Sequence, residues 1–183
     1  ERPELDGRPP ALDWQAQTSA DGRVHLGPSW FERREGRSLL YLEGPPFPIG
    51  YANAHLTSEF LEIQERSLME TVEEHFPSIF SRLALGLLVL VNNRNLSDYV
   101  APEYRLEILG LSRGRAEDPY PYMGPRYNRV LNYHAAHDIS HWVWDAPVLG
   151  CSAFAARGSR TRAGTLLVGR NFDWEAGAHF DRN

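Results

Sequence analysis

Two short apolar runs decide the fold expected for this chain: Gly150-Cys151-Ser152-Ala153-Phe154-Ala155-Ala156 and Thr165-Leu166-Leu167-Val168-Gly169-Arg170-Asn171-Phe172-Asp173-Trp174. A polar segment, residues 157–164, joins them and has a glycine near each end. Apolar runs of this length bounded by turn residues are typical of β-strands. The sequence therefore predicts a β-hairpin with a loop of several residues.

The first run carries Cys151, the only cysteine in the chain. Symmetric pairing about Arg160 and Thr161 would set Cys151 opposite Arg170, and directly opposed residues lie about 5 Å apart at Cβ. A guanidinium at that distance favours the thiolate, which is the attacking form of cysteine. Cys151 is therefore a candidate nucleophile, and Asp173 could hold Arg170 or a polar group of a substrate. The alternative is that Cys151 is a buried small hydrophobe.

Together the two runs resemble the N-terminal-nucleophile (Ntn) cysteine hydrolases of the penicillin acyltransferase, acid ceramidase and choloylglycine (bile-salt) hydrolase type. The likeness rests on Cys151-Ser152 and on the later run Gly169-Arg170-Asn171-Phe172-Asp173-Trp174. A second, independent likeness lies in Gly44-Pro45-Pro46-Phe47-Pro48-Ile49-Gly50-Tyr51. The resemblance implies an autocleavage junction between Gly150 and Cys151, with Cys151 as the catalytic nucleophile. It also implies that Arg170, Asn171 and Asp173 bind substrate or support the oxyanion.

The chemistry implied by this resemblance is consistent with general principles. An α-amino group has a pKa of about 7.7–8, so near neutral pH it can take the thiol proton without a histidine. Before cleavage that nitrogen is an amide, so the precursor should be inactive. The resulting hypothesis is an autoproteolytic amidohydrolase or acyltransferase that acts on a linear amide through a Cys151 thioester. It expects a small-molecule amide or lipid-amide substrate and no cofactor.

Composition limits the other possibilities. The chain has 183 residues, of which 42% are hydrophobic and 23% charged, as is usual for one globular domain. A formal net charge of −5 argues against nucleic acid as a partner. The longest apolar run, residues 83–91, is too short for a transmembrane segment. The sequence starts Glu1-Arg2-Pro3-Glu4, so a leader could have been removed, and the compartment stays open between cytoplasm and secretion.

The predicted fold class is α+β: a mainly helical N-terminal region followed by the first β-hairpin of an Ntn-type αββα sandwich. Three parts are expected, namely an irregular arm over residues 1–36, a helical pro-segment over 37–150 and the start of the catalytic part over 151–183. Strands are predicted at 23–26 and 38–43, helices at 58–76, 77–91, 102–109 and 126–142, and a loop at 113–125.

Three local expectations accompany these element assignments. The three prolines of residues 45–48 argue against helix there. Gly110 is expected to close the 102–109 helix. The 77–91 helix is apolar nearly all round, so it should be buried.

Three alternatives stay open. His134, His137, Asp138 and His141 share one helical face and could bind a metal ion, although one straight helix rarely supplies three ligands to a tetrahedral centre. One of these histidines could instead pair with Cys151 as in a Cys–His protease. Since only 33 residues, 151–183, run from the nucleophile to the end, the remaining catalytic residues are expected downstream or on another chain. The protein could then be a non-catalytic pro-segment that binds a separate catalytic chain.

Overall fold

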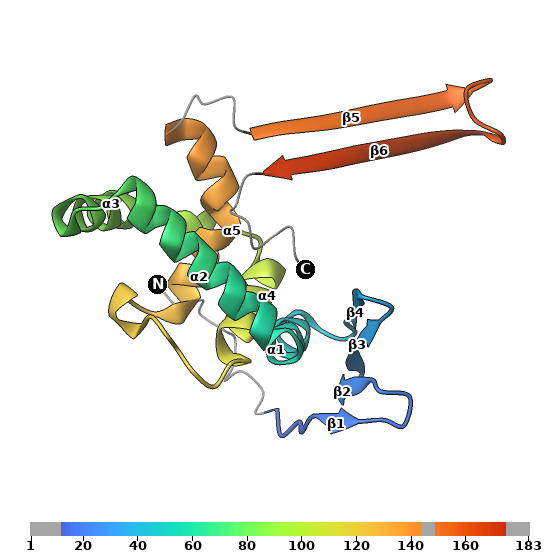
Figure 1. Ribbon diagram of the computed structural model, residues 1–183, viewed down its shortest axis with the longest axis horizontal. Helices are drawn as coiled ribbons and strands as arrows, with labels where there is room; N and C mark the ends of the chain where they lie inside the picture. Colours follow the sequence, from blue (N-terminus) through green and yellow to red (C-terminus); the bar gives the residue numbers. More distant parts are fainter. Residues whose placement is uncertain (1–11, 144–148, 175–183) are drawn as a thin grey trace.

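The computed structural model describes residues 12–143 and 149–174, with side chains for residues 12–135 and 152–171. It confirms an α+β fold, in which helices follow a small sheet and precede a long hairpin (Figure 1). In chain order the elements are β1 (Gln17–Thr18), β2 (Val24–Leu26), β3 (Ser29–Arg34), β4 (Arg37–Tyr41), α1 (Pro46–Leu56), α2 (Ser58–His75), α3 (Ile79–Asn92), η1 (Leu96–Tyr99), α4 (Pro102–Arg113), η2 (Pro121–Met123), α5 (Arg126–Val143), β5 (Leu149–Gly158) and β6 (Gly164–Trp174).

The N-terminal region contains an antiparallel sheet, so the prediction of an irregular arm over residues 1–36 is wrong within the described part, which begins at residue 12. The strand order is β1-β2-β3-β4. Arg34 pairs with Arg37 across a two-residue turn, in which Glu35 (φ 53°) and Gly36 (φ 74°) both have positive φ. This is the backbone that a type I′ hairpin turn requires. The glycines of this region therefore mark tight turns between strands.

The hydrophobic core lies where α1, α4 and α5 meet. Its buried residues are Phe47, Ile108, Leu109, Tyr127 and Leu131. Aromatic contacts join the sheet to the helices: the Trp14 ring packs on Gly27 and lies edge-on to Tyr51 at 6.5 Å between centroids. Phe31 of β3 meets Phe60 of α2 in the same way at 5.8 Å. Sheet and helices therefore form one packed body.

Helices α1 and α4 approach each other very closely through glycine. Gly50 of α1 lies against the backbone of Glu107 and Leu111, and Gly110 of α4 lies against the backbone of Phe47. A Cβ at either glycine would overlap the backbone of the partner helix. Glycine is needed at both positions because only a residue without a side chain lets the two backbones come this near.

Two predictions about helix ends are wrong, and the structure explains both. Helix α1 begins at Pro46, within the proline-rich residues 45–48 that were predicted to exclude helix. Proline is tolerated in a first turn because the N–H groups there have no intrahelical partner. Gly110 does not close the helix predicted over 102–109, since α4 continues past it and uses the glycine for contact with α1.

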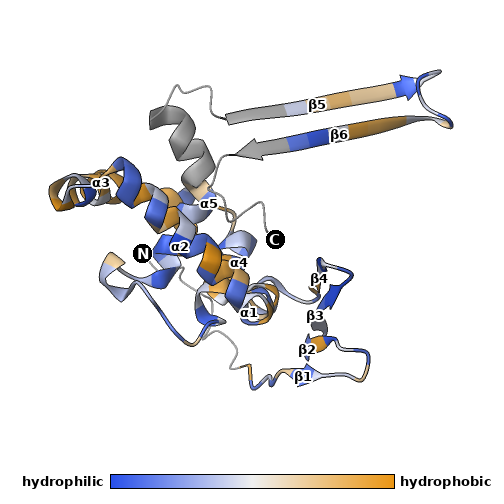
Figure 2. Cartoon of the chain, viewed as in Figure 1, coloured by the Kyte–Doolittle hydropathy of each residue, from blue (hydrophilic) through white to orange (hydrophobic). Residues whose placement is uncertain are grey.

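Helix α3 is exposed, so the prediction of a buried helix over residues 77–91 is wrong. None of its residues is buried in the described structure, and no described element packs extensively against it. Its exposed apolar side chains include Ile79, Phe80, Leu83, Leu87, Leu88, Leu90 and Val91. In Figure 2 much of helix α3 has the colour of hydrophobic residues. The apolar pattern thus predicted the helix correctly, while burial also depends on a covering partner.

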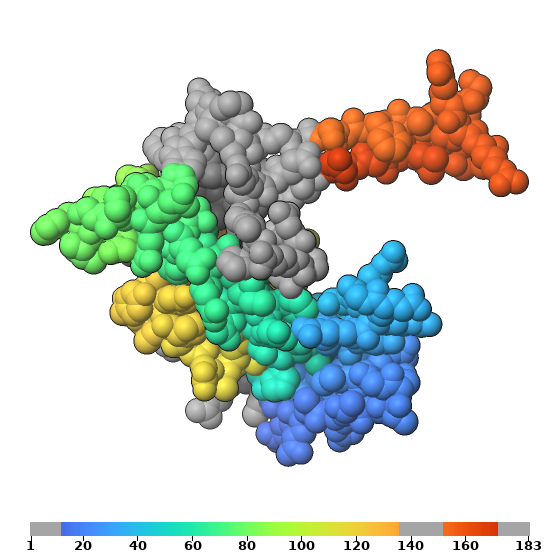
Figure 3. All heavy atoms as spheres, viewed as in Figure 1, coloured from blue at the N-terminus to red at the C-terminus, as the bar shows by residue number. Residues whose placement is uncertain are grey.

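Within the described residues, no single helix is long and apolar enough to cross a bilayer. Helices α2 and α3 satisfy the length and hydropathy test only when taken together, and they bend by 118° where they meet. The β5–β6 hairpin extends away from the sheet and helices, as Figure 1 and the space-filling view in Figure 3 show.

Candidate functional site

The predicted hairpin is present, and it brings the two motifs into one antiparallel ladder. Gly150 pairs with Asp173, Cys151 with Phe172, and Ala153 with Arg170. The prediction that Cys151 lies directly opposite Arg170 is therefore wrong by two residues. A shift of two keeps the alternation of the strands, so Arg170 occupies the diagonal position relative to Cys151, and diagonal neighbours lie about 7–8 Å apart.

The register differs from symmetric pairing for two reasons, each worth one residue: Gly164 pairs with Gly158 and not with Arg157, and the strands contain a bulge beside this pair. The ladder shifts between Ala156 and Gly158, and Gly158 pairs with Gly164. Both glycines have positive φ, at 66° and 67°. Within the loop the Thr161 hydroxyl donates a hydrogen bond to the carbonyl of Thr165 at 2.9 Å. This local loop structure sets which residues face the first motif.

A cross-strand contact fixes the same register nearer the motifs. Phe154 pairs with Gly169, and its ring lies where a Cβ on Gly169 would be. Gly169 opens the Gly-Arg-Asn-Phe-Asp-Trp motif, so its missing side chain has a packing role in this ladder. An aromatic ring over a glycine on the neighbouring strand is a known device for holding strands in register.

The structure places the predicted site residues at the base of the hairpin. Asn171 pairs with Ser152, and both it and Arg170 are exposed. The backbone of Gly150, Cys151 and Asp173 belongs to the ladder, while the side chains of Cys151 and Asp173 lie outside the described part. The predicted autocleavage junction, Gly150 and Cys151, is thus paired with Asp173 and Phe172 at the end of the second motif.

Both sides of the hairpin carry large exposed apolar side chains. Strand alternation puts Phe154 and Leu167 on one side and Leu166 and Val168 on the other. Their exposed fractions are 65%, 54%, 61% and 69%, respectively. Strands with apolar residues on both faces are typical of sheets that are covered on both sides. The hairpin therefore has the composition of an inner element of a layered structure.

The alternative metal site is not assembled from described side chains. Helix α5 carries His134, His137 and His141 as predicted, and His134 is exposed. The side chains of His137, Asp138 and His141 lie outside the described part. Among the described residues, no three His, Cys, Asp or Glu side chains gather in a metal-binding arrangement.

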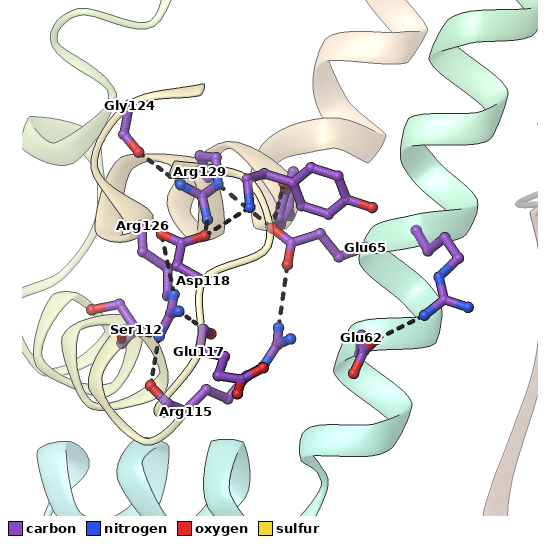
Figure 4. Close-up of polar contacts among 12 residues, drawn as sticks. Glu62, Glu65, Ser112, Arg115, Glu117, Asp118, Gly124, Arg126 and Arg129 are labelled. Carbon is purple, nitrogen blue, oxygen red and sulfur yellow. Dashed lines mark hydrogen bonds and ion pairs between the residues drawn. The ribbon is translucent and has the colours of Figure 1, made fainter. Parts of the chain in front are cut away.

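A second polar centre, which the sequence reasoning missed, lies within the helical body (Figure 4). Its middle is Glu65 of α2, which is 7% exposed at the side chain. Glu65 accepts a hydrogen bond from the Tyr133 hydroxyl at 2.9 Å and pairs with Arg115 at 3.2 Å and with Arg129 at 3.5 Å. In the sequence this centre is indicated only by the position of Glu65, which lies at helical spacing between Leu61 and Leu68, where an apolar residue is expected.

Asp118 extends this centre toward the surface. It pairs with Arg129 at 2.5 Å and with Arg126 at 3.7 Å, and it accepts a hydrogen bond from the backbone N–H of Tyr120 at 3.1 Å. Burial acts to raise the pKa of Asp118, but the hydrogen bonds from Arg129 and Tyr120 outweigh it and hold that pKa below its usual value. Burial, together with the charge and the hydrogen bond of Glu65, strongly raises the pKa of the Tyr133 phenol.

Arg126 is held mainly by backbone carbonyls. It donates hydrogen bonds to the carbonyl of Arg115 at 2.7 Å and to that of Glu117. Burial lowers the pKa of Arg126, Asp118 acts against this, and the positive charges of Arg115 and Arg129 add to the lowering. Positive charge is therefore concentrated at this end of α5.

A pocket of about 360 Å³ opens beside this centre. Its walls come from the end of α4, the segment that follows α4 and the first turn of α5. The charged residues that line it are Arg113, Arg115, Asp118 and Arg126, and apolar walls come from Leu109 and Tyr127. None of these residues belongs to the motifs of the hairpin.

The chain is similar to a protein of Archaeoglobus fulgidus that is described as uncharacterized. The two are 27% identical over 153 residues, which cover 75% of this chain and 24% of that protein. The chain thus spans about a quarter of the length of the curated relative it matches. No family model and no solved structure matches the chain.

Proposed function

We propose that the protein is an Ntn-type cysteine amidohydrolase or acyltransferase that matures by cleaving its own chain between Gly150 and Cys151. The observation that carries this proposal is the ladder of the hairpin. It pairs the junction residues Gly150 and Cys151 with Asp173 and Phe172 of the second motif. Two stretches that resemble the same enzyme family therefore meet in space, as a shared site requires.

Maturation is a rearrangement of one peptide bond. The Cys151 sulfur attacks the Gly150 carbonyl carbon, the C–N bond breaks, and the nitrogen takes a proton to become the α-amine of Cys151. Water then hydrolyses the resulting thioester, which leaves the Gly150 carboxylate on one fragment and the free Cys151 thiol on the other. Gly150 suits this step because it has no side chain to shield its carbonyl.

Turnover uses the same atoms in their cleaved form. The free α-amine accepts the thiol proton, and the thiolate attacks the carbonyl carbon of a linear amide. The amide C–N bond breaks, the leaving amine takes the proton, and the acyl group remains on sulfur as a thioester. Water releases it as a carboxylic acid, or an acceptor amine takes it in acyl transfer. Arg170, Asn171 and Asp173 are proposed to position the substrate.

The exposed apolar surfaces support a larger assembly around this site. The two sides of the hairpin and helix α3 expose large apolar side chains together, far beyond the single exposed residues that are normal on a protein surface. We propose that further residues of the same polypeptide, or a separate catalytic chain, cover them. If a separate chain does so, these 183 residues act as a pro-segment that binds it, which is the second candidate function.

Trapping of the acyl-enzyme tests the proposal. The purified protein is incubated with p-nitroanilides of several acyl chain lengths, and intact-mass spectrometry measures the fragment that begins at Cys151. We expect one acyl group added to that fragment and release of p-nitroaniline. Cys151→Ala should abolish both, whereas Ser152→Ala, a matched change at the next residue, should retain the adduct. Turnover by the Cys151→Ala variant would contradict the assignment of the nucleophile.

A further inference from the structure

We infer that the pocket between the end of α4, the segment after it and the first turn of α5 binds a small oxyanion, the carboxylate or phosphate group of a free small molecule. This site shares no residue with the hairpin motifs, so the inference goes beyond the proposed amidase activity and does not depend on it.

The first argument is the balance of charge around the pocket. Three arginines, Arg113, Arg115 and Arg126, line it, against the single carboxylate of Asp118. Asp118 is already engaged, since it pairs with Arg129 at 2.5 Å and with Arg126 at 3.7 Å. Arg115 pairs with Glu65 at 3.2 Å, and Arg129 shares Glu65 and Asp118. The four arginines in and beside the pocket therefore exceed these two carboxylates by two charges, in a chain whose formal net charge is −5. An excess of positive charge at a partly buried site is stabilised by an anion that binds there.

The second argument comes from the hydrogen-bond and ion-pair partners of the individual guanidinium groups. Arg126 donates to the carbonyls of Arg115 and Glu117, which are neutral acceptors. Its carboxylate partner, Asp118, lies 3.7 Å away and also pairs with Arg129, so the two arginines share one negative charge. Arg113 is exposed, and no carboxylate lies within ion-pair distance of it in the described structure. The first turn of α5 contains no acidic side chain either.

The lowered pKa of Arg126, which burial causes and the neighbouring arginines reinforce, agrees with this excess of positive charge.

The third argument is that the size and the lining of the pocket match a small oxyanion. A volume of about 360 Å³ lies at the small end of the range for ligand pockets. The planar guanidinium group matches carboxylate and phosphate oxygens with two parallel hydrogen bonds. Leu109 and Tyr127 add an apolar wall that can contact the carbon skeleton of a small ligand. The pocket thus combines donors for an oxyanion with space for a few additional atoms.

Thermal unfolding in the presence of inorganic phosphate tests the inference, because a ligand that binds only the folded state raises Tm with concentration. The same protein is measured in potassium chloride and in sodium acetate at equal ionic strength. We expect phosphate, acetate or both to raise Tm above the chloride control in a saturable manner. Which of the two acts distinguishes a phosphate group from a carboxylate group as the recognised chemistry.

Arg113→Gln is the informative variant, because an exposed side chain can be replaced without disturbing the buried pairs. We expect this variant to bind the oxyanion with about tenfold lower affinity. Arg94→Gln, which removes an exposed arginine outside the pocket, serves as the matched control and should respond like the unmodified protein. The inference is overturned if neither anion exceeds chloride, or if Arg113→Gln responds as fully as the control.

Discussion

The helical body and the β5–β6 hairpin differ in how far their side chains are buried and in how many partners those side chains have. In the body, Glu65 is 7% exposed and meets Tyr133, Arg115 and Arg129, while α1 and α4 approach through glycine. In the hairpin, Phe154 is 65% exposed although it belongs to a regular ladder. The body is therefore stabilised by its own described contacts, whereas the hairpin carries the proposed catalytic residues on strands whose large apolar side chains are exposed. Substitutions in the two regions should accordingly affect different properties.

The largest effect on stability is expected at Glu65. Glu65→Ala leaves Arg115 without its carboxylate partner and Arg129 with Asp118 alone, and breaking a buried pair costs about 3–5 kcal/mol. Denaturant unfolding followed by circular dichroism measures this free energy. Glu62→Ala on the same helix removes only an exposed pair with Arg66 and should cost about 0.3–0.5 kcal/mol. Equal costs for the two variants would contradict the central role given to Glu65.

A smaller loss is expected where α1 meets α4. Gly110→Ala places a methyl group against the backbone of Phe47, and such overpacking costs about 1–3 kcal/mol. Gly86→Ala in α3 is the matched control, since a Cβ there meets nothing within 4 Å. It should stabilise the helix by about 0.5–1 kcal/mol, because glycine is a poor helix former. If both variants shifted Tm in the same direction, the close approach of the helices would not matter for stability.

Alkaline pH should weaken the body through Tyr133. Its pKa is raised above the ordinary value of 10.0 by burial and by Glu65, so the folded state binds this proton more tightly than the unfolded state. The stabilisation is fully present below pH 10 and is lost as pH rises above it. Unfolding measured between pH 9 and about 11.5 should show this slope. Tyr133→Phe should remove that part of the slope, and an unchanged slope would exclude Tyr133 as its source.

The smallest effect on stability is expected in the hairpin. Phe154→Ser removes a ring that is largely exposed, so the free energy of unfolding of the body should change by less than about 0.5 kcal/mol. The same change removes apolar surface that a covering layer would need. A loss of several kcal/mol would show that the hairpin already contributes to the stable core, and the contrast between the two regions would fail.

Periodicity in the sequence was sufficient for many of the elements. The helix predicted over 126–142 is α5, and the strand predicted over 38–43 overlaps β4. Burial could not be predicted for residues 77–91. An apolar sequence indicates that a helix would be more stable when covered, but it does not show whether another element covers it. The prolines at residues 45–48 were misread because their effect depends on whether they fall in the first turn or in the interior of a helix.

In the candidate site, the sequence predicted the hairpin but not which residues contact one another. The hairpin followed from two apolar runs, but pairing of Gly164 with Gly158, together with a bulge beside that pair, moved the partner of Cys151 from Arg170 to Phe172. The centre around Glu65 could not be predicted because its partners, Arg115, Arg129 and Tyr133, are distant in sequence. They come together only where α2, the segment after α4 and α5 meet.

The measurement that tests the central claim most directly is the intact mass of the purified protein, compared with that of the Cys151→Ala variant. The account predicts that the unmodified protein consists of two fragments, one of which begins Cys-Ser-Ala-Phe, and that the variant remains a single uncut chain. An uncut unmodified protein, or a variant cleaved at the same bond, would contradict self-processing by Cys151.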